Sequence, residues 1–498
     1  MAGPDLQALE QAAQSGNPMA RIELGNHLLG EHPPGSPESR RGLELLRAAA
    51  EGPGGAAAQW LLGGYFLQTP AEPDAHAEAA RWLERAAAAG VPPAIDRLAN
   101  LNLRGLGMPR DPARALELLA RLADAGFQRA AWDMGYLLGQ GEPDSDEPGA
   151  ASAFARACAL GYPPAYYSLG LRFALGAGVE RDPAFARALL LRAHDGRFPD
   201  ALAAADGLVS EEECGEESAR WHGLLKENHV AARPMREQLT HSGITIDDSL
   251  KPGVRRLEAH FAALGHPGLV IDPAGRLGVK GGGNGTLKAA PGPWEWLSGR
   301  PRVGVSRHFA TREECAHLMY KVSDSLARAE EYITDTVNGE VETVFFSGRG
   351  RPLGALTSDT VVRVLEQRIA TMSECAVDTL EPCSIICYEP GEEYRPHVDY
   401  FNDEQLERNR SEIKDAGGQR VATFLLCLHA PEAGGETVYP ETGLSVAYEP
   451  AMALLHYNVT ADGRPDLLSV HTGRPVERGQ KWLFRTTLRE HSRFPATG

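Results

Sequence analysis

Apolar stretches rich in Ala and Leu recur at a nearly constant interval through the first two-fifths of the chain. They end at glycines spaced 36, 35 and 35 residues apart, namely Gly90, Gly126, Gly161 and Gly196, and a less regular unit ends near Gly52. A second apolar stretch follows the turns, as in RLANLNLRGLG after the first. We expect each unit to be two short antiparallel helices, with glycine as the left-handed residue that ends the first helix. Stacked units of this kind form an all-α solenoid of helix-pair repeats.

Two of these units carry a clear pattern of small residues and glycine turns. Residues 164–193 combine a small-residue helix, close to the form A-x-x-L-G-x-x-Y, with a G-x-G turn and Asp182, and residues 94–123 are similar. From about residue 18 to residue 200 the chain resembles the Sel-one-like repeats, relatives of the tetratricopeptide repeat. The resemblance implies an array that binds proteins or peptides. A purely structural scaffold or a dimerisation arm is the alternative.

The next segment is less regular. EEECGEESARWHGLLKENHV and GVRRLEAHFAALG have the pattern of helices, and KGGGNGTLKAAPGP reads as a flexible, proline-bounded linker. Its glycines lack the Gly-Lys-Ser/Thr ending of a phosphate-binding loop, so we interpret them as linker.

The pattern of apolar positions changes at about Trp294. ATREECAHLMYKVSDSLARA and SDTVVRVLEQRIATMSE are amphipathic and predict two helices. Short runs rich in β-branched and aromatic residues then alternate with turn residues, and each predicts a strand: CSIICYEP, RVATFLLCLHA, ETVYPET, LSVAYEP, AMALLHYNV, LLSVHTGRPV and KWLFRTTLRE. Many short strands indicate a β-sandwich or barrel, with the two helices packed outside one sheet.

One polar triplet, His397-Val-Asp399, follows the first of these strands, and His471 lies in a later one. Alone the triplet is uninformative, because the chain has 16 histidines. However, residues two apart on an extended segment point to the same side of the backbone. Two histidines and one carboxylate on one face form the Fe(II) site that activates dioxygen. His471 is the obvious third ligand, and Lys481 could pair with the far carboxylate of a dicarboxylate cosubstrate.

Three segments in a fixed order connect this chemistry to a family. YEPGEEYRPHVDYF fits the motif Y-x-x-G-x-x-Y-x-x-H-x-D, Gly434–Pro440 forms a GGET-x-x-P turn, and VHTGRPVERGQKWL carries the last histidine and the lysine. Over about residues 296–490 the chain resembles the prolyl 4-hydroxylase family of 2-oxoglutarate- and iron(II)-dependent oxygenases. The resemblance implies a double-stranded β-helix, or jelly roll, with flanking helices. The expected fold is therefore multidomain, with an N-terminal all-α solenoid and a C-terminal jelly roll.

The resemblance also implies a role for each residue of these motifs. His397, Asp399 and His471 would hold the iron, Lys481 would bind the C5 carboxylate of 2-oxoglutarate, Tyr388 and Thr423 would donate hydrogen bonds nearby, and Tyr394 would face the substrate. The alternatives are ordinary strand residues at Tyr388 and Thr423, a packing residue at Tyr394 and a solvated lysine at Lys481. We expect His429 and His456 to be hydrogen-bonded strand residues rather than ligands.

The reaction implied by the resemblance consumes dioxygen and 2-oxoglutarate, releases succinate and carbon dioxide, and hydroxylates an unactivated C–H bond. Retention of Asp399 favours hydroxylation over halogenation, because related halogenases have a small residue there. The sequence departs from the family pattern at two places, both expected to lie towards the substrate rather than the iron. Glu342-Thr343-Val344 replaces an Arg-Thr segment, and Thr487 replaces a tryptophan six residues beyond the lysine. The chemistry is therefore better supported than a prolyl target.

Composition and charge narrow the possible partners. Hydrophobic residues make up 43% of the chain and charged residues 23%, with a mean hydropathy of −0.30, as in soluble globular proteins. A net charge of −17 argues against a general nucleic-acid or acidic-membrane partner. Seven scattered cysteines without a Cys-x-x-Cys are expected to be reduced thiols, and we see no signal peptide or bilayer-spanning stretch. A cytoplasmic location is the simplest expectation.

These observations predict three regions: a helical repeat domain at 1–205, a helical or irregular connector with a Gly/Pro linker at 206–290, and an oxygenase domain at 291–498. We expect a dioxygenase that uses Fe(II), 2-oxoglutarate, O2 and ascorbate to hydroxylate a peptidyl residue, most simply proline. The repeats would engage the protein or peptide substrate or a protein partner. A hydroxylase of a free amino acid or peptide natural product is one alternative, and a non-catalytic interaction protein is another.

Overall fold

The structure is a computed structural model of the 498-residue chain. It describes the chain except for residues 1–5, 53, 70–73, 142–144, 199, 228–257, 274, 282, 284, 286, 290, 329–332, 336–341, 345–347, 354–358, 409–412, 414–416 and 493–498.

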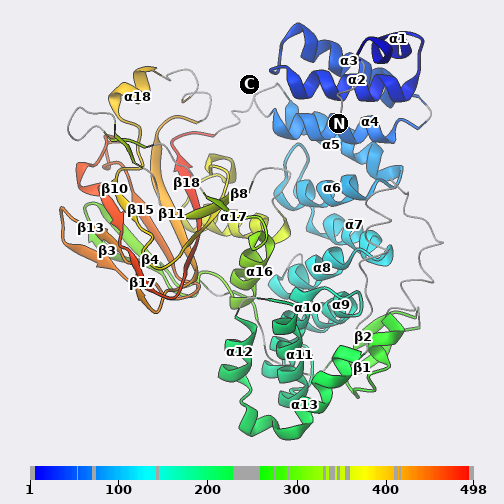
Figure 1. Cartoon of the computed structure of the whole chain (residues 1–498), viewed down its shortest axis with the longest axis vertical. Helices are drawn as coiled ribbons and strands as arrows, with labels where there is room; N and C mark the ends of the chain where they lie inside the picture. Colours follow the sequence, from blue (N-terminus) through cyan, green and yellow to red (C-terminus); the bar gives the residue numbers. More distant parts are fainter. Residues whose placement is uncertain are drawn as a thin grey trace.

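Antiparallel helix pairs stack in chain order through the N-terminal part and form a curved solenoid (Figure 1). Each predicted unit is a pair, and the helices are short because a proline or a capping side chain begins them and a turn ends them. The solenoid comprises α1 (Leu6–Gln14), α2 (Pro18–Glu31), α3 (Pro37–Ala50), α4 (Ala56–Gln68), α5 (Ala75–Ala88), α6 (Pro92–Arg104), α7 (Pro112–Asp124), α8 (Gln128–Gln140), α9 (Glu147–Ala159), α10 (Pro163–Leu175), α11 (Pro183–Asp195), α12 (Ala201–Leu208) and α13 (Glu211–Glu227).

The turn after each first helix has the left-handed residue that the spacing predicts, with one exception. Gly90, Gly126 and Gly161 have φ values of 81°, 90° and 78°. In the last unit Gly196 has a φ of −78°, and Arg197 takes the left-handed conformation with a φ of 59°. The expectation that Gly196 takes the left-handed conformation was therefore wrong. That conformation falls one residue later, on Arg197, although it is uncommon for a residue other than glycine.

The connector packs along the repeats. The first predicted connector helix is α13, and beyond the undescribed stretch two short strands, β1 (Leu269–Ile271) and β2 (Leu277–Val279), form a hairpin. The Glu258 carboxylate accepts a 2.6 Å hydrogen bond from Arg156 of α9, and His266 lies 2.8 Å from Asp182, which caps α11. Each of these contacts ties the connector to a repeat.

The glycine-rich segment was expected to be flexible, but its described residues lie against the solenoid. The Gly285 N–H donates to the Gly176 carbonyl at 3.0 Å. A Cβ added at Gly283 would lie 1.8 Å from the same carbonyl oxygen, so only glycine permits this approach. The boundary expected at residue 205 falls inside α12.

Two antiparallel sheets face each other in the C-terminal part and form the jelly roll (Figure 1). The seven predicted strands are confirmed, but two strands at each end of the major sheet and the first strand of the minor sheet escaped prediction. The major sheet runs β3 (Glu295–Gly299), β4 (Arg302–Ser306), β15 (Ala453–Tyr457), β11 (Arg420–His429), β18 (Lys481–Arg489), β9 (Ser384–Tyr388), β8 (Arg349–Pro352), β5 (Ala327–Arg328), and the minor sheet runs β10 (Tyr394–His397), β16 (His471–Gly473), β13 (Thr437–Tyr439), β14 (Leu444–Val446). Small elements complete the domain: β6 (Ile333–Asp335) with β7 (Glu342–Val344), β12 (Ala433–Gly434) with β17 (Val476–Arg478), α18 (Asp403–Arg408), and the 3-10 turns Val377–Thr379 and Leu467–Ser469.

The two faces of the major sheet pack against different parts of the protein. Along β11, Leu425 and Cys427 belong to the core between the sheets, whereas Phe424 and Leu426 belong to the core on the opposite face. That second core also contains residues of the two predicted helices, α16 (Arg312–Val322) and α17 (Thr360–Met372), and of the repeats from α7 onward. The jelly roll and the C-terminal half of the solenoid therefore share one hydrophobic core.

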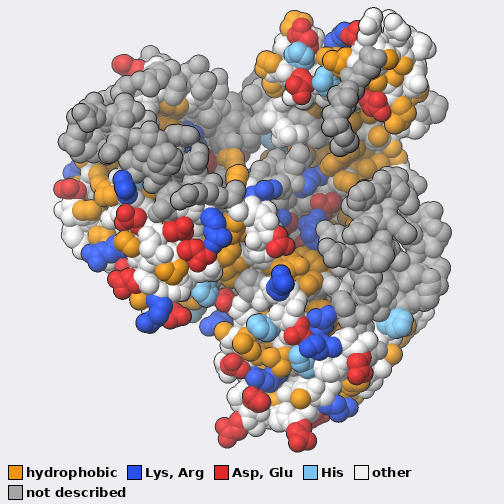
Figure 2. All heavy atoms as spheres, viewed as in Figure 1, with side chains coloured by type: hydrophobic (Ala, Val, Ile, Leu, Met, Phe, Trp, Pro, Cys, Tyr) orange, Lys and Arg blue, Asp and Glu red, His pale blue; other side chains and the backbone are white. Residues whose placement is uncertain are grey.

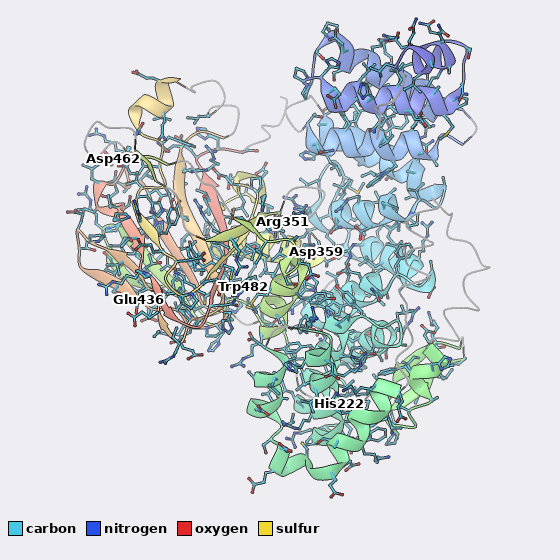
Figure 3. The ribbon with its side chains drawn as sticks, in the orientation of Figure 1. His222, Arg351, Asp359, Glu436, Asp462 and Trp482 are labelled. Atoms are coloured by element: carbon cyan, nitrogen blue, oxygen red, sulfur yellow. The ribbon has the colours of Figure 1, made fainter. Side chains whose placement is uncertain are left out.

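Buried polar contacts cross the same interface. The Trp132 ring of α8 stacks on the His317 ring of α16 at 4.1 Å between centroids. His317 also lies 2.9 Å from the carboxylate of Asp359, which caps α17. Figure 3 shows Asp359 on the side of the jelly roll that faces the repeats. The interface therefore has defined partners in addition to apolar contact.

One buried carboxylate, that of Glu314, joins three elements. Arg368 of α17 donates to both of its oxygens at 2.9 Å, and the Tyr136 hydroxyl of α8 donates to it at 2.5 Å. Burial raises the pKa of Glu314, but the charge of Arg368 and these hydrogen bonds outweigh burial and lower the pKa below its usual value. Glu314 is therefore an ionised group whose neutralisation depends on Arg368.

Replacing Arg368 with alanine should destabilise the whole chain. The change leaves the Glu314 carboxylate buried without its cation, and breaking a buried pair in this way costs about 3–5 kcal/mol. Urea denaturation followed by circular dichroism measures the loss. Arg114→Ala is the matched control, since Arg114 pairs with Glu117 on an exposed helix face and its loss costs roughly 0.5 kcal/mol or less. Equal stability of the two variants would contradict the buried-pair interpretation.

Candidate iron centre and cosubstrate pocket

Strand pairing in the minor sheet brings the predicted ligands together. His397 ends β10, His471 begins β16, and the two residues are direct cross-strand partners. Asp399 follows two residues after His397, so its side chain returns to the same face. One ligand atom from each residue lies within 4.8 Å of the others, and all three residues are buried. This is the single group of three metal-ligating side chains at such spacing in the part of the chain that the structure describes.

Backbone contacts fix how both histidines present their rings. His397 Nδ1 lies 2.7 Å from the Arg395 carbonyl, and His471 Nδ1 lies 3.0 Å from the Ser469 carbonyl. A carbonyl oxygen only accepts, so each Nδ1 carries the proton and each Nε2 keeps its lone pair. Burial, together with the neighbouring histidines, lowers the pKa of His471 well below its usual value. Both Nε2 atoms are therefore prepared for a metal ion.

The Asp399 carboxylate is held in place by neighbours from the major sheet. The Thr423 hydroxyl of β11 donates to Oδ2 at 2.6 Å, and His456 Nε2 of β15 lies 3.3 Å from the same oxygen. Burial raises the pKa of Asp399, but the surrounding histidines and the nearby positive charge of Arg485 outweigh it and hold the pKa well below its usual value. Asp399 is therefore an anion throughout the physiological range.

Two residues of this arrangement, Tyr439 and His456, were not assigned a role from the sequence. The Tyr439 hydroxyl lies 2.6 Å from His456 Nδ1. The Asp399 oxygen accepts from His456 Nε2–H, so Nδ1 must accept the proton of the Tyr439 hydroxyl. His456 is thus a hydrogen-bonded strand residue, as expected, but its bond supports the ligand carboxylate. His429, the other histidine set aside, lies 3.2 Å from Asp200 at the repeat interface.

A small cavity opens beside these three residues and contains Lys481. The Lys481 ammonium donates to the Gly435 carbonyl at 2.6 Å and lies 5.3 Å and 4.6 Å from the ring centroids of Tyr388 and Tyr448. Burial lowers the pKa of Lys481 to about 8. The cavity is lined by residues of both sheets: Ile386, Tyr388, Tyr394, His397, Asp399, Thr423, Leu425, Thr437, His471, Gly473, Lys481, Leu483 and Arg485.

The remaining predicted site residues also line this cavity, with contacts of their own. Tyr388 is the cross-strand partner of Lys481. The Tyr394 ring stacks on the His397 ring at 3.7 Å between centroids, so it packs against a ligand as well as facing the cavity. Thr423 uses its one hydroxyl proton on Asp399, so its place is beside the iron ligands.

The two departures from the family pattern lie in different places. Thr487 is buried on β18, where it is the cross-strand partner of Thr423. Glu342–Val344 forms the strand β7, whose side chains lie outside the described residues.

The donor set fits a divalent iron. Two neutral imidazoles and one carboxylate on one side of a metal are the ligands of non-haem Fe(II) oxygenases, with the opposite side left open. Here the cavity provides that open side, and a buried ammonium lies farther along it. The arrangement defines an iron- and dicarboxylate-dependent oxygenase of the jelly-roll class.

Family models match both halves of the chain. The model described as the 2OG-Fe(II) oxygenase superfamily matches residues 383–489. The model described as the Sel1 repeat matches residues 56–91, 92–127, 128–162 and 163–195. These ranges contain all the proposed iron ligands and four helix pairs.

Among curated proteins, two plant enzymes are similar to the oxygenase part. Probable prolyl 4-hydroxylase 10 of Arabidopsis thaliana is 33% identical over 221 residues, which is 40% of this chain and 72% of that protein. Prolyl 4-hydroxylase 5 of the same plant is 33% identical over 207 residues, which is 38% of this chain and 68% of that protein. The chain belongs to the prolyl 4-hydroxylase family. It is a 2-oxoglutarate-dependent dioxygenase that uses Fe(II) and O2, with ascorbate as the typical reductant of the family, rather than a non-catalytic interaction protein.

Solved structures resemble each half separately. The viral collagen prolyl hydroxylase of Paramecium bursaria Chlorella virus-1 matches with a TM-score of 0.29 and 17% identity, over 38% of this chain and 94% of that one. A Sel1 repeat protein from Oxalobacter formigenes matches with a TM-score of 0.37 and 22% identity, over 53% of this chain and 88% of that one. Separately, none of the helices in the described residues has the length and apolar character to cross a membrane.

The lowered pKa of Lys481 predicts how cosubstrate affinity changes with pH. The role expected for Lys481 requires its ammonium form, which predominates below about pH 8 and is lost above it. The dissociation constant of 2-oxoglutarate should therefore rise by up to about tenfold per pH unit above pH 8. Calorimetric titration with 2-oxoglutarate between pH 7 and pH 10 measures this change. Lys481→Arg should flatten the profile, because an arginine stays charged over this range. The same profile in both proteins would rule out Lys481 as the titrating group.

Proposed function

We propose that the chain hydroxylates a prolyl residue of a protein or peptide. The observation that carries the proposal is the convergence of His397, Asp399 and His471 beside a cavity that also holds a buried lysine. The two plant relatives are named as prolyl 4-hydroxylases, which favours proline over other residues as the target. A free amino acid or a peptide natural product is the second candidate substrate. Glu342–Val344 and Thr487, which differ from the family pattern at positions expected to face the substrate, favour keeping this candidate.

We further propose a role for each site residue. His397 Nε2, His471 Nε2 and an oxygen of Asp399 would bind the iron, and Lys481 with Tyr388 would bind the C5 carboxylate of 2-oxoglutarate. When bound, iron and 2-oxoglutarate supply the oxidising power that hydroxylates a C–H bond. The chain itself orients the two histidines through the Arg395 and Ser469 carbonyls and keeps Asp399 ionised. Thr423 holds Asp399 in place, and Tyr394 would face the substrate beside His397.

Purified protein supplied with Fe(II), ascorbate and 2-oxoglutarate should form succinate, and a proline-containing substrate should gain one oxygen. Extract proteins incubated with and without the enzyme, then digested and analysed by mass spectrometry, reveal the modified residue. His397→Ala and Asp399→Ala should lower turnover by at least about a thousandfold, since each removes one of three ligands. His429→Ala is the control, because His429 contacts Asp200 away from the cavity. Full turnover in either ligand variant would refute the site, and oxygen gain on a residue other than proline would refute the target.

We also propose that the repeats bind the protein substrate or a partner in a groove shared with the oxygenase. A cavity of about 2130 Å³, open to solvent, lies between α4–α8 and α16. Aromatic and proline side chains line it together with charged ones: Trp60, Pro92, Pro93, Phe127, Tyr162, Tyr320, Asp96, Arg129, Lys321, Asp324 and Asp359. Figure 2 shows basic and acidic side chains close together along the boundary between the jelly roll and the solenoid. Aromatic-lined grooves of this kind recognise extended, proline-containing segments.

Replacing Trp60 with alanine should weaken capture of a protein substrate but spare the chemistry. The KM for the full-length substrate should rise about tenfold, since an aromatic anchor contributes roughly 1.5 kcal/mol or more, while kcat stays unchanged. A short peptide around the target proline should react equally well with both enzymes, because it does not reach the groove. Trp296→Ala is the matched control, since Trp296 is an exposed tryptophan on β3 outside the groove. An unchanged KM for the full-length substrate would remove the groove from the proposal.

A cytoplasmic location completes the proposal. All seven cysteines are free thiols in the structure, and six of them are buried. Such a pattern suits a reducing compartment, where disulfides do not persist.

A further inference from the structure

A chain of buried polar side chains crosses the space between the two sheets and ends at Asp399. Tyr439 lies on β13 of the minor sheet, and His456 and Thr423 lie on β15 and β11 of the major sheet. All of them are buried. Thr423 and His456 are direct cross-strand partners, so their side chains stand next to each other on the same face of the sheet. The register of the major sheet therefore presents two polar groups to Asp399 together.

Both of these groups meet the same oxygen of Asp399. The Thr423 hydroxyl lies 2.6 Å from Oδ2, and His456 Nε2 lies 3.3 Å from it. A carboxylate oxygen offers about two lone pairs, so two donors match what Oδ2 can accept. The other oxygen, Oδ1, lies 3.5 Å from Nε2 of His397, which is one of the proposed ligands. Oδ1 is therefore the oxygen better placed for a metal.

The direction of the His456 bond depends on Tyr439. The Tyr439 hydroxyl lies 2.6 Å from His456 Nδ1 and donates its proton there, so the proton of the ring stays on Nε2. Without the hydroxyl the ring could carry its proton on Nδ1 and turn the Nε2 lone pair toward the carboxylate. Oδ2 would then lose a donor and face a second lone pair. Tyr439 thus acts on Asp399 through His456.

The same two residues pack against a second proposed ligand, His471. Strand β13 pairs Val438 with Thr472 of β16, and this register brings Tyr439 next to His471 across the strands. The ring centroid of His471 lies 5.8 Å from that of Tyr439 and 4.4 Å from that of His456. Tyr439 and His456 therefore support two of the three proposed ligands from one side.

We propose that Tyr439 and His456 are positioning residues of the iron centre. Tyr439 fixes the proton on His456, and His456 and Thr423 hold Oδ2, so that Asp399 binds the metal through Oδ1 alone. This inference rests on the proposed iron site and adds how its carboxylate is oriented. A carboxylate that binds through one oxygen takes one coordination position instead of two, which leaves more of the metal open to the cosubstrate. Hydrogen-bond partners of metal ligands typically contribute 10–100-fold to metal affinity.

Two variants test the proposal with Co(II) as the probe, because its visible absorption reports the coordination geometry. Tyr439→Phe removes only the hydroxyl, and His456→Leu removes both ring nitrogens. Each should raise the dissociation constant of Co(II) about 10–100-fold and change the absorption spectrum, because Asp399 is then free to turn both oxygens to the metal. The titrations use the full chain without 2-oxoglutarate or substrate, and thermal unfolding of the metal-free proteins is measured alongside.

A conservative variant separates the hydrogen bonds from mere packing. In His456→Gln the side-chain amide can donate to Asp399 while its carbonyl accepts from Tyr439, so Co(II) affinity and spectrum should stay close to those of the wild type. A loss as large as that of His456→Leu would overturn the proposal.

Tyr136→Phe is the matched control for a lost buried hydroxyl. Tyr136 is also fully buried, and its hydroxyl donates to Glu314 outside the site. This variant should lower the unfolding temperature but leave the Co(II) affinity and spectrum unchanged. An equal loss of Co(II) affinity in Tyr136→Phe would mean that stability alone controls metal binding, and it would overturn the positioning role.

The outcomes also separate this inference from the proposed function. Wild-type affinity and spectrum in both Tyr439→Phe and His456→Leu would overturn the inference and leave the iron site standing. Failure of the wild-type protein to bind Co(II) would overturn the iron site and the inference together. Weakened binding in the two variants, with oxygen gain on a residue other than proline, would support the positioning role and refute only the prolyl target.

Discussion

The alternation of side chains across the major sheet is the constraint on which the rest of this structure depends. Each of its central strands gives one set of residues to the space between the sheets and the next set to the helices outside. On β11, Thr423 and Leu425 reach the cavity while Phe424 and Leu426 pack under α16 and α17. A shift of one residue in register would exchange the two sets and abolish both the site and the interface.

This arrangement separates the proposed iron ligands from the groove proposed for a protein substrate or partner. The proposed iron ligands lie between the sheets, whereas the repeats pack on the outer face through α16 and α17. A segment in the groove beside Trp60 and Tyr320 is therefore on the opposite side of the sheet from Asp399. A protein bound in the proposed groove would have to reach the cavity around the sheet rather than through it. The buried Glu314–Arg368 pair and the stacking of Trp132 on His317 stabilise the interface between the jelly roll and the solenoid. The distance from the groove to the cavity is therefore fixed.

The sequence was sufficient for the elements whose pattern is regular and for residues inside a motif. Periodic glycines predicted the helix pairs, alternation predicted the central strands, and the ordered motifs predicted the cavity residues His397, His471 and Lys481. It was insufficient where a polar residue acts through a partner far along the chain. Tyr439 and His456 are ordinary strand residues until the pairing of the sheets brings them to Asp399. Likewise the glycine-rich segment was predicted to be a flexible linker, because composition does not reveal that its backbone contacts the Gly176 carbonyl.

Electrostatics explains why so many polar groups can be buried around one small cavity. Asp399 is an acid kept ionised by hydrogen bonds and a nearby guanidinium, His471 is a base kept neutral by burial, and Lys481 has a pKa of about 8. Each group is thereby held in the protonation state that a cation ligand or an anion receptor needs near neutral pH. These protonation states suit the proposed binding of a metal at the Asp399 side of the cavity and of a dianion at the Lys481 side.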